Sequence, residues 1–374
     1  MHMVWQPTLA ELPEQPGVYL FRDGKGGILY IGKALNLRRR VASYFHRRRR
    51  QPARLRRMLA RARAVTFSLT GSELEALLLE SRLLKQETPP FNQLSLEYTV
   101  PTFVKLTLAE PFPRLLLTHA FEADGSQYLG PFPRFDMAEV VLAALQRLVP
   151  LRTCEGPIAP GVSPLPCSAF HVKKCVGPCV SHDHTPAYGL QVAELLALLG
   201  RGHAGILQGL IAARERAAAA MLFERAGHLH ALLTAFDAVT VGRPLALIPV
   251  AHRNLAVLFR RSSSTHEMFL VRHGLFVERV SVQGAAQDLA WLRTTLAGCY
   301  VPAESVPMRD GQAAVDELRI VGGWLHRTCN RARWVLMPPQ MCLTDAVEAI
   351  AETIFTAEGA EIAESREVCH RMPR

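Results

Sequence analysis

The stretch GVYLFRDGKGGILYIGKALNLRRRVASYF, from Gly17 to Phe45, constrains the fold more than any other part of the chain. Two six-residue β-type runs flank an Asp-Gly-Lys-Gly turn, a pattern that predicts a hairpin. Asn36 then stands where a helix N-cap is expected, before a helix over residues 37–45. The apolar side of this helix is predicted from a spacing of four residues between Leu37, Val41 and Phe45.

The elements that follow complete a small α+β domain. The sequence predicts a basic helix over residues 53–62 and a third strand over 64–70. Ser72 and Glu75 form a capping box for a further helix that runs to about residue 86, before a Pro-Pro stop. We therefore predict a three-stranded antiparallel sheet flanked by helices.

The rest of the chain divides by composition into further segments. Strands and a helix are predicted up to residue 150, two helices over 188–236, a β-meander over 244–282, and two or three helices after it. The predicted fold class is α+β throughout. The expected domains are the N-terminal α+β domain at 1–98, connecting strands and a helix at 99–150, a Cys-rich segment at 151–185, a helical segment at 186–238, and a C-terminal α+β domain of unassigned role at 239–374.

Positive charge is concentrated near the N-terminus. The chain has a net charge of +10, with 37 arginines and six lysines. Fifteen basic residues and one acid, Asp23, lie between Arg22 and Arg63, and Arg47–Arg50 is an unbroken run. Such a block repels itself unless a polyanion neutralises it, and nucleic acid is the expected partner. An anionic membrane surface is a weaker alternative, because the arginine spacing leaves no clean apolar face.

The expected compartment follows from what the sequence lacks. The N-terminal residues show no basic and then apolar signal-peptide pattern, and no apolar run is long enough to span a bilayer. We expect a cytoplasmic protein with no membrane partner. Its eight cysteines are then expected to be reduced or bound to metal.

Phenols and cations gather around the predicted hairpin. Tyr19 and Tyr30 lie on its strands, Lys33 follows the second strand, and Arg40 and Tyr44 share a helix face. Such groups can stabilise charge on a phosphoryl group during phosphodiester hydrolysis.

One carboxylate lies close to the same place in the predicted fold. Glu80 falls on or beside the apolar face of its helix, where a charge needs a metal or a cation. Simple pairing of Glu80 with an arginine is the alternative. Asn92, just past the Pro-Pro stop, can return an amide to the same area.

Several ordered motifs resemble a known family. GVY at 17–19 and YIG at 30–32 resemble the two namesake tripeptides of the GIY-YIG nucleases. The resemblance extends through YIGKALNLRRRVASYF, EALLLESRLLKQETPPFN and QYLGPF, which look like the N-terminal half of the UvrC excinucleases and like their short homologue Cho.

The resemblance implies a role for each site residue. Glu80 would hold one divalent cation, Mg²⁺ or Mn²⁺, and Arg40 would stabilise the phosphate in the transition state. Tyr30 would act near the attacking water with Lys33 beside it, and which phenol or lysine takes the proton is open. Tyr19 and Tyr44 would orient the site, and Asn92 would brace it. The expected DNA contacts are Arg38, Arg39, Arg47, Arg48, Arg49, Arg50, Lys173 and Lys174.

Four cysteines form a second constellation. Twelve, seven and three residues separate Cys154, Cys167, Cys175 and Cys179. This density in a cytosolic protein predicts a metal site, and the spacing leaves iron–sulfur and zinc nearly even. The resemblance implies a [4Fe–4S] cluster, with zinc as the alternative. His171 is a further candidate ligand, whereas the scattered cysteines at 299, 329, 342 and 369 are expected to be ordinary thiols.

The implied activity is endonucleolytic. The resemblance implies hydrolysis of one phosphodiester near a lesion in damaged double-stranded DNA, as the 3′ incision of excision repair. The DNA would be presented in a UvrB–DNA preincision complex, with UvrA acting upstream. Residues 210–233 look like a degenerate UvrB-binding hairpin, in which His230 and Ala231 depart from the family pattern. The alternatives are a mobile-element or structure-specific nuclease of this family, and a nucleic-acid-binding module that does not cleave.

Overall fold

The fold is that of a computed structural model. The structure describes residues 2–4, 12–46, 52–92, 100–161, 166–262, 265–283, 288–300, 311–329, 331–338 and 341–355. The chain divides into two compact units, Met1–Thr99 and Val100–Arg374, and each is described by itself. Among the described residues, no helix is both long and apolar enough to cross a membrane.

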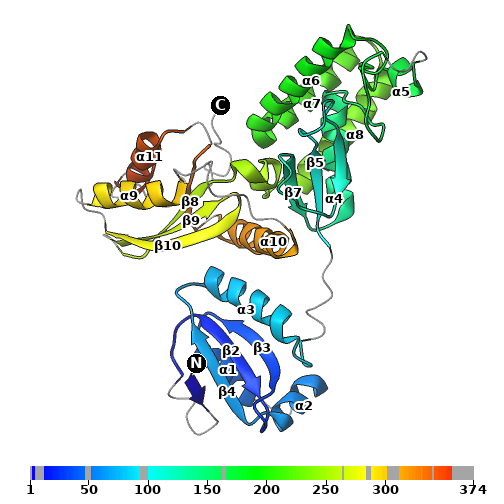
Figure 1. The fold of residues 1–374 in the computed structure, drawn as a ribbon. Helices are drawn as coiled ribbons and strands as arrows, with labels where there is room; N and C mark the ends of the chain where they lie inside the picture. Colours follow the sequence, from blue (N-terminus) through cyan, green and yellow to red (C-terminus); the bar gives the residue numbers. More distant parts are fainter. Residues whose placement is uncertain are drawn as a thin grey trace. The chain divides into compact units, whose positions relative to one another are not determined.

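The first unit is built on an antiparallel sheet (Figure 1). The three predicted strands are present, and a short strand β1 adds a fourth at the outer side of β4. The strand order is β1-β4-β2-β3, so the second hairpin strand, β3, forms a sheet edge. The strands are β1 His2–Val4, β2 Gly17–Arg22, β3 Ile28–Ala34 and β4 Ala64–Leu69.

Helices cover both faces of this sheet (Figure 1). On one face, Tyr19 and Phe21 pack with α1 and α2. On the other face, Val18 and Leu20 pack with α3, as expected for alternating side chains on one strand. The helices are α1 Leu37–Phe45, α2 Ala53–Arg61 and α3 Glu73–Glu87.

Local chemistry fixes the helix starts where the sequence predicts them. The Asn36 side chain accepts a hydrogen bond from the Arg39 N–H at 2.9 Å, and the Ser72 hydroxyl accepts one from the Glu75 N–H at 3.2 Å. The predicted apolar stripe of α1 needs one correction. Tyr44 is 5% exposed and belongs to the core, whereas Phe45 is only partly buried.

The second unit begins with a three-stranded antiparallel sheet of order β6-β5-β7. The helix α4 covers it and packs in turn against α7 and α8, so that one core joins the sheet to the helical segment. The elements are β5 Thr102–Leu106, β6 Leu115–Thr118, β7 Gln127–Phe132 and α4 Phe135–Leu148.

The helical segment differs from its prediction. Three long helices replace the two predicted over residues 188–236, because the chain turns at Gly202, whose φ of +59° favours glycine. The last two form a hairpin with a turn at 220–222. The helices are α5 Ser168–His171, α6 His184–Gly200, α7 Gly202–Ala219 and α8 Phe223–Thr240.

The C-terminal part is α+β, as predicted, with a meander of β8, β9 and β10 joined by β11 in the order β10-β9-β8-β11. Trp324 belongs to the basic and aromatic stretch 322–335. It is 3% exposed and packs on Phe259 and Phe269, so it is a core residue. The elements are η4 Pro244–Leu247, η5 Val250–His252, β8 Leu255–Arg260, β9 Thr265–Arg272, β10 Leu275–Gln283, α9 Asp288–Tyr300, α10 Gly311–Thr328, β11 Arg333–Leu336 and α11 Leu343–Phe355.

Candidate active site

An open cavity of about 600 Å³ lies in the first unit, where β3, the start of α1 and the middle of α3 meet. Five of the seven predicted catalytic residues line it, although they come from separate parts of the sequence. Its wall also includes Arg39 and the exposed side chain of Leu35. The five are Tyr19, Tyr30, Lys33, Arg40 and Glu80.

Phenols and one guanidinium form the inner wall. The hydroxyl oxygens of Tyr19 and Tyr44 lie 2.7 Å apart, and Arg40 donates from Nε to the Tyr19 oxygen at 3.3 Å. The Arg40 guanidinium also lies 5.4 Å from the centre of the Tyr44 ring. A Cβ at Gly32 would lie 2.5 Å from the Tyr19 oxygen, so glycine is required there. Tyr44 therefore supports the site from behind the cavity.

The phenols of Tyr19 and Tyr30 are held in their neutral form. Burial raises the pKa of Tyr19 well above its ordinary value, and the neighbouring phenols of Tyr44 and Tyr30 raise it further. Burial also raises the pKa of Tyr30, and Arg40 offsets only part of this effect. Both side chains can therefore donate a hydrogen bond at neutral pH. Either phenol would need added positive charge nearby before it could accept a proton from water.

The edge of β3 explains how Glu80 reaches the cavity. Three outward backbone positions along this edge are satisfied by groups outside the sheet. Phe91 donates its N–H to the Leu29 carbonyl at 3.1 Å, and Asn92 bonds both backbone groups of Ile31, at 2.9 and 2.8 Å. At the third position the Lys33 N–H donates to Glu80 Oε1 at 3.0 Å.

This arrangement places the carboxylate where a cation is favourable. α3 packs on the face of the sheet that bears Val18 and Leu20, yet the side chain of Glu80 passes the edge of β3 and lines the cavity. Burial raises the pKa of Glu80, and the Lys33 N–H lowers it only in part. Within the described ranges, Glu80 forms no salt bridge, so simple pairing with an arginine is not seen. The charge on Glu80 is therefore incompletely compensated by the protein.

Lys33 is held by a residue that the sequence analysis did not select. Its Nζ forms an ion pair with Glu73 at 3.1 Å. Glu73 lies two helical turns before Glu80, and this spacing of seven places both carboxylates on one side of α3. The sequence did contain a signal for Glu73, because its spacing from Glu80 puts two acids on one helix face beside a predicted strand end.

The remaining predicted residues lie elsewhere. Asn92 is 3% exposed and lies beside the edge of β3, and it is not part of the cavity lining. Arg38 donates to the Leu12 carbonyl and pairs with Glu14 at 2.6 Å, so its guanidinium is already engaged. Lys173 and Lys174 are exposed and belong to the second unit. Arg47, Arg48, Arg49 and Arg50 lie outside the described residues.

The four cysteines of the second constellation converge on Cys175. Burial raises the pKa of the Cys175 thiol, and the other three thiols, which lie close enough to interact with it, raise it further. The Gly177 N–H donates to Cys175 Sγ at 3.3 Å. In the described part of the chain, however, no three or more His, Cys, Asp or Glu side chains are grouped closely enough to hold a metal ion. The thiols are gathered but do not form a closed metal site.

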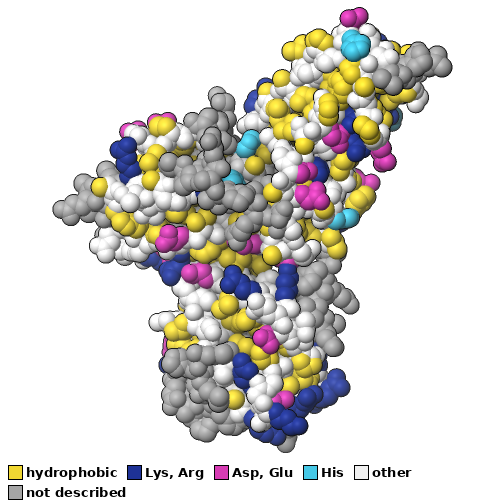
Figure 2. Space-filling model, in the orientation of Figure 1, with side chains coloured by type: hydrophobic (Ala, Val, Ile, Leu, Met, Phe, Trp, Pro, Cys, Tyr) yellow, Lys and Arg dark blue, Asp and Glu magenta, His cyan; other side chains and the backbone are white. Residues whose placement is uncertain are grey.

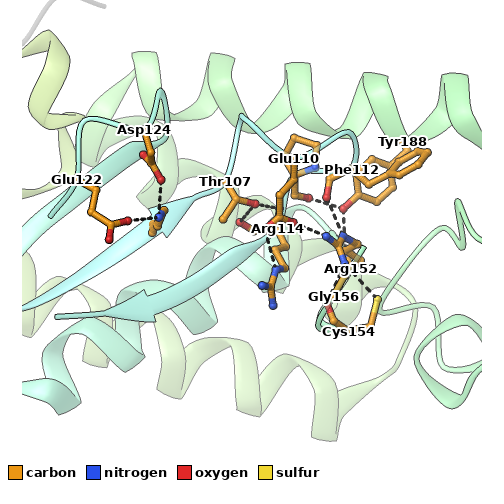
Figure 3. A network of polar contacts seen from close by, with 12 residues as sticks. Thr107, Glu110, Phe112, Arg114, Glu122, Asp124, Arg152, Cys154, Gly156 and Tyr188 are labelled. Carbon is orange, nitrogen blue, oxygen red and sulfur yellow. Dashed lines mark hydrogen bonds and ion pairs between the residues drawn. The ribbon is translucent and has the colours of Figure 1, made fainter. Parts of the chain in front are cut away.

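A buried arginine anchors the start of this segment (Figure 3). Arg152 donates to the carbonyls of Phe112, Cys154 and Gly156 and pairs with Glu110. Its own N–H donates to the Tyr188 hydroxyl at 3.0 Å. Arg152 Nη1 also lies 3.7 Å from Cys154 Sγ. The cysteine segment is thereby tied to the loop between β5 and β6 and to α6.

Comparisons with known proteins find relatives of two parts of the chain. Residues 15–93 match the model of the UvrC-like GIY-YIG domain, and residues 102–198 match that of the UvrC/Cho excinuclease middle domain. The chain is 34% identical to the UvrABC system protein C of Desulforudis audaxviator over 79% of this chain and 48% of that protein. It is 36% identical to that of Moorella thermoacetica over 64% of this chain and 39% of that protein. The chain spans about half the length of the curated relatives it matches.

A solved structure is also similar to part of the chain. The GIY-YIG N-terminal endonuclease domain of UvrC from Thermotoga maritima, bound to its catalytic divalent cation magnesium, is 33% identical. The match covers 24% of this chain and 99% of that domain, with a TM-score of 0.21.

Proposed function

Because residues 15–93 are a UvrC-like GIY-YIG domain and residues 102–198 a UvrC/Cho middle domain, we propose that this chain is a DNA endonuclease of excision repair. It would hydrolyse one phosphodiester near a lesion in a divalent-metal-dependent reaction, at the 3′ side. The observation that carries the proposal is the convergence of Glu80, Arg40 and the phenols on one open cavity.

The donor set fits magnesium or manganese. Mg²⁺ keeps several of its waters and is often bound through only one or two carboxylates together with substrate phosphates. Glu80 offers one half-buried carboxylate whose charge the protein leaves incompletely compensated. A bound divalent ion would stabilise charge on the phosphate and leaving oxygen.

The other side chains have distinct parts in the proposed mechanism. Arg40, positioned by Tyr19 and stacked on Tyr44, points its guanidinium to where phosphoryl charge develops. Tyr30 donates a hydrogen bond that orients the attacking water. Lys33, held in place by its ion pair with Glu73, attracts the phosphate.

The test is nicking of damaged DNA by single variants. Purified full chain is incubated with Mg²⁺ and ultraviolet-damaged plasmid, with and without UvrA and UvrB. Glu80→Ala and Arg40→Ala should abolish nicking while DNA binding survives. Glu87→Ala and Arg82→Ala, at exposed positions of α3, are the matched controls and should nick normally. The nick should carry a 5′-phosphate and a 3′-hydroxyl.

Each outcome has a clear meaning. Normal nicking by Glu80→Ala would remove the assigned active site. Nicking that needs neither UvrA nor UvrB would favour a structure-specific nuclease of the same family. Binding without any nicking would leave a nucleic-acid-binding module.

The partner proposal concerns the turn between α7 and α8. Three consecutive apolar residues there, Met221, Leu222 and Phe223, are 73%, 49% and 68% exposed. Exposed apolar side chains at the end of a helical hairpin are suited to docking on another protein. We propose that this turn docks on a UvrB–DNA complex. Phe223→Ala should abolish UvrB-dependent nicking, whereas Leu190→Ala, at another exposed apolar position, should not.

We also propose that the four cysteines can bind a [4Fe–4S] cluster, with zinc as the alternative. Their approach to Cys175 supports this proposal, although the thiols must draw closer together than they lie in this structure. Anaerobically purified protein should be brown and lose its visible absorbance in Cys175→Ser. A colourless protein with stoichiometric zinc would instead identify a zinc site.

A further inference from the structure

Helix α2 and the turn between β2 and β3 carry a group of exposed cations outside the cavity. We call these residues the α2 basic surface: Lys25, Arg56, Arg57, Arg61 and Arg63. Figure 2 shows Lys and Arg side chains gathered over this end of the first unit.

The helix is oriented by its apolar side. Met58 and Leu59 are 0% and 5% exposed and belong to the core around Tyr19 and Phe21. Arg56 and Arg57 precede this pair and project to solvent from the outer side. Burial of the apolar side thus forces the arginines outward, and α2 cannot rotate to hide them without exposing its core residues.

Among the described residues of the first unit, the charge of this surface is compensated only in part, through the interaction of the Asp23 carboxylate with Arg61 and Lys25. Arg56, Arg57 and Arg61 make no ion pair with any described residue. Asp23 is the nearby acid, and its carboxylate already accepts hydrogen bonds from the backbone N–H groups of Lys25 and Gly27, at 2.9 and 2.8 Å. Clustered arginines without carboxylate partners repel one another, and phosphates of a polyanion remove that cost.

The surface is anchored to the same strand edge as the catalytic carboxylate. Arg54 donates to the Phe91 carbonyl at 2.5 Å, and the Arg61 guanidinium lies 5.8 Å from the Phe91 ring centre. The Phe91 N–H donates to the Leu29 carbonyl on β3. Leu29 lies four residues before Lys33, whose N–H donates to Glu80. Four residues of strand span about 13 Å, which corresponds to about four base pairs of duplex.

We propose that the α2 basic surface is a second DNA contact, which binds the sugar–phosphate backbone about four or more base pairs from the phosphodiester in the cavity. The contact is to phosphates, which fix the position of a protein on the duplex without reading its sequence. It rests on the proposed function and extends the bound DNA to one side of the cleavage site. It would orient the scissile phosphate by fixing the duplex at two separated places.

Binding in the absence of metal tests this proposal separately from cleavage. Full-length protein is titrated into a fluorescein-labelled 40-base-pair duplex in EDTA, and anisotropy is recorded between 50 and 300 mM KCl. Arg56→Gln/Arg57→Gln should lower the slope of log K against log[salt] by about 1.8, since each lost phosphate contact removes about 0.9. Affinity near 0.1 M salt should fall roughly 10- to 60-fold.

Matched variants control for net charge and for folding. Arg82→Gln/Lys85→Gln removes the same two charges from exposed positions of α3, on the opposite side of the sheet, and should leave the slope nearly unchanged. Arg56→Lys/Arg57→Lys should restore most of the slope. An equal loss in the α2 and α3 variants would show a diffuse charge effect and overturn the proposal. No loss in the α2 variant would overturn it as well.

Discussion

Asn92 offers the sharpest test of how the site is held together, because its side chain makes two hydrogen bonds to one buried residue. Its Oδ1 accepts from the Ile31 N–H and its Nδ2 donates to the Ile31 carbonyl. Ile31 is 0% exposed and Asn92 is 3% exposed. Asn92→Ala therefore leaves one donor and one acceptor buried without partners.

The expected cost follows from these two groups. An unsatisfied buried polar group costs about 1–3 kcal/mol, so Asn92→Ala should destabilise the first unit by roughly 2–6 kcal/mol. Asn36→Ala is the matched control, because it removes one hydrogen bond at a partly exposed helix cap, worth about 1 kcal/mol. Both variants make the same chemical change in the same unit.

Hydrogen exchange of the full chain measures the effect locally. A loss of about 3 kcal/mol should speed exchange of the amides in β3 by roughly 100-fold in Asn92→Ala. Nicking should fall with it, since Tyr30 and Lys33 lie on the same strand. If β3 exchanged no faster in Asn92→Ala than in Asn36→Ala, the idea that Asn92 completes the strand edge would be wrong.

Three further predictions concern the cavity. Burial raises the pKa of Glu80, so the folded chain binds this proton more tightly than the unfolded one. The resulting stability is full below the unfolded pKa, about 4.3, and is lost as pH rises through the folded pKa. Thermal melts in EDTA should thus find Glu80→Gln more stable than the parent chain at pH 7.5 but not at pH 4, and separate melts with Mg²⁺ in place of EDTA should show stabilisation of the parent only. Glu73→Gln should lower nicking severalfold, because the Lys33 side chain loses the ion pair that holds it beside the cavity; unchanged nicking would contradict this positioning role. Tyr44→Phe should slow nicking about tenfold by removing the hydroxyl that positions Tyr19, at a cost in stability of only about 1 kcal/mol; unchanged nicking would contradict that role.

Local signals in the sequence predicted the elements that carry the site. The Asp-Gly turn, the Asn36 cap and the Ser72 capping box each act over a few residues, and all three appear where they were expected. The fourth strand β1 was missed because three residues carry no usable period, and its pairing partner lies about 60 residues away. The break between α6 and α7 was also missed, since a single glycine such as Gly202 is compatible with a continuous helical pattern.

The arrangement of the cavity was only partly accessible from the sequence. Spacing predicted that Glu80 lies beside the apolar face of α3. It did not predict that the Glu80 side chain passes the edge of β3 and lines the cavity. Periodicity cannot give that result, because it depends on which strand is at the edge and on where residues after α3 return. The ion pair of Lys33 with Glu73 joins residues 40 positions apart, so periodicity cannot predict it either.

The strand edge links the stability of the first unit to its proposed chemistry. An edge strand exposes unpaired backbone groups, and here Phe91, Asn92 and Glu80 satisfy them in order along β3. The first two are neutral, and the buried Asn92 and the partly buried Phe91 hold β3 in place. The third is a carboxylate at the end that opens into the cavity, where a neutral amide would satisfy Lys33 equally well at less cost in desolvation. A charge retained at that position, against its own desolvation cost, is what a metal-binding role for Glu80 requires.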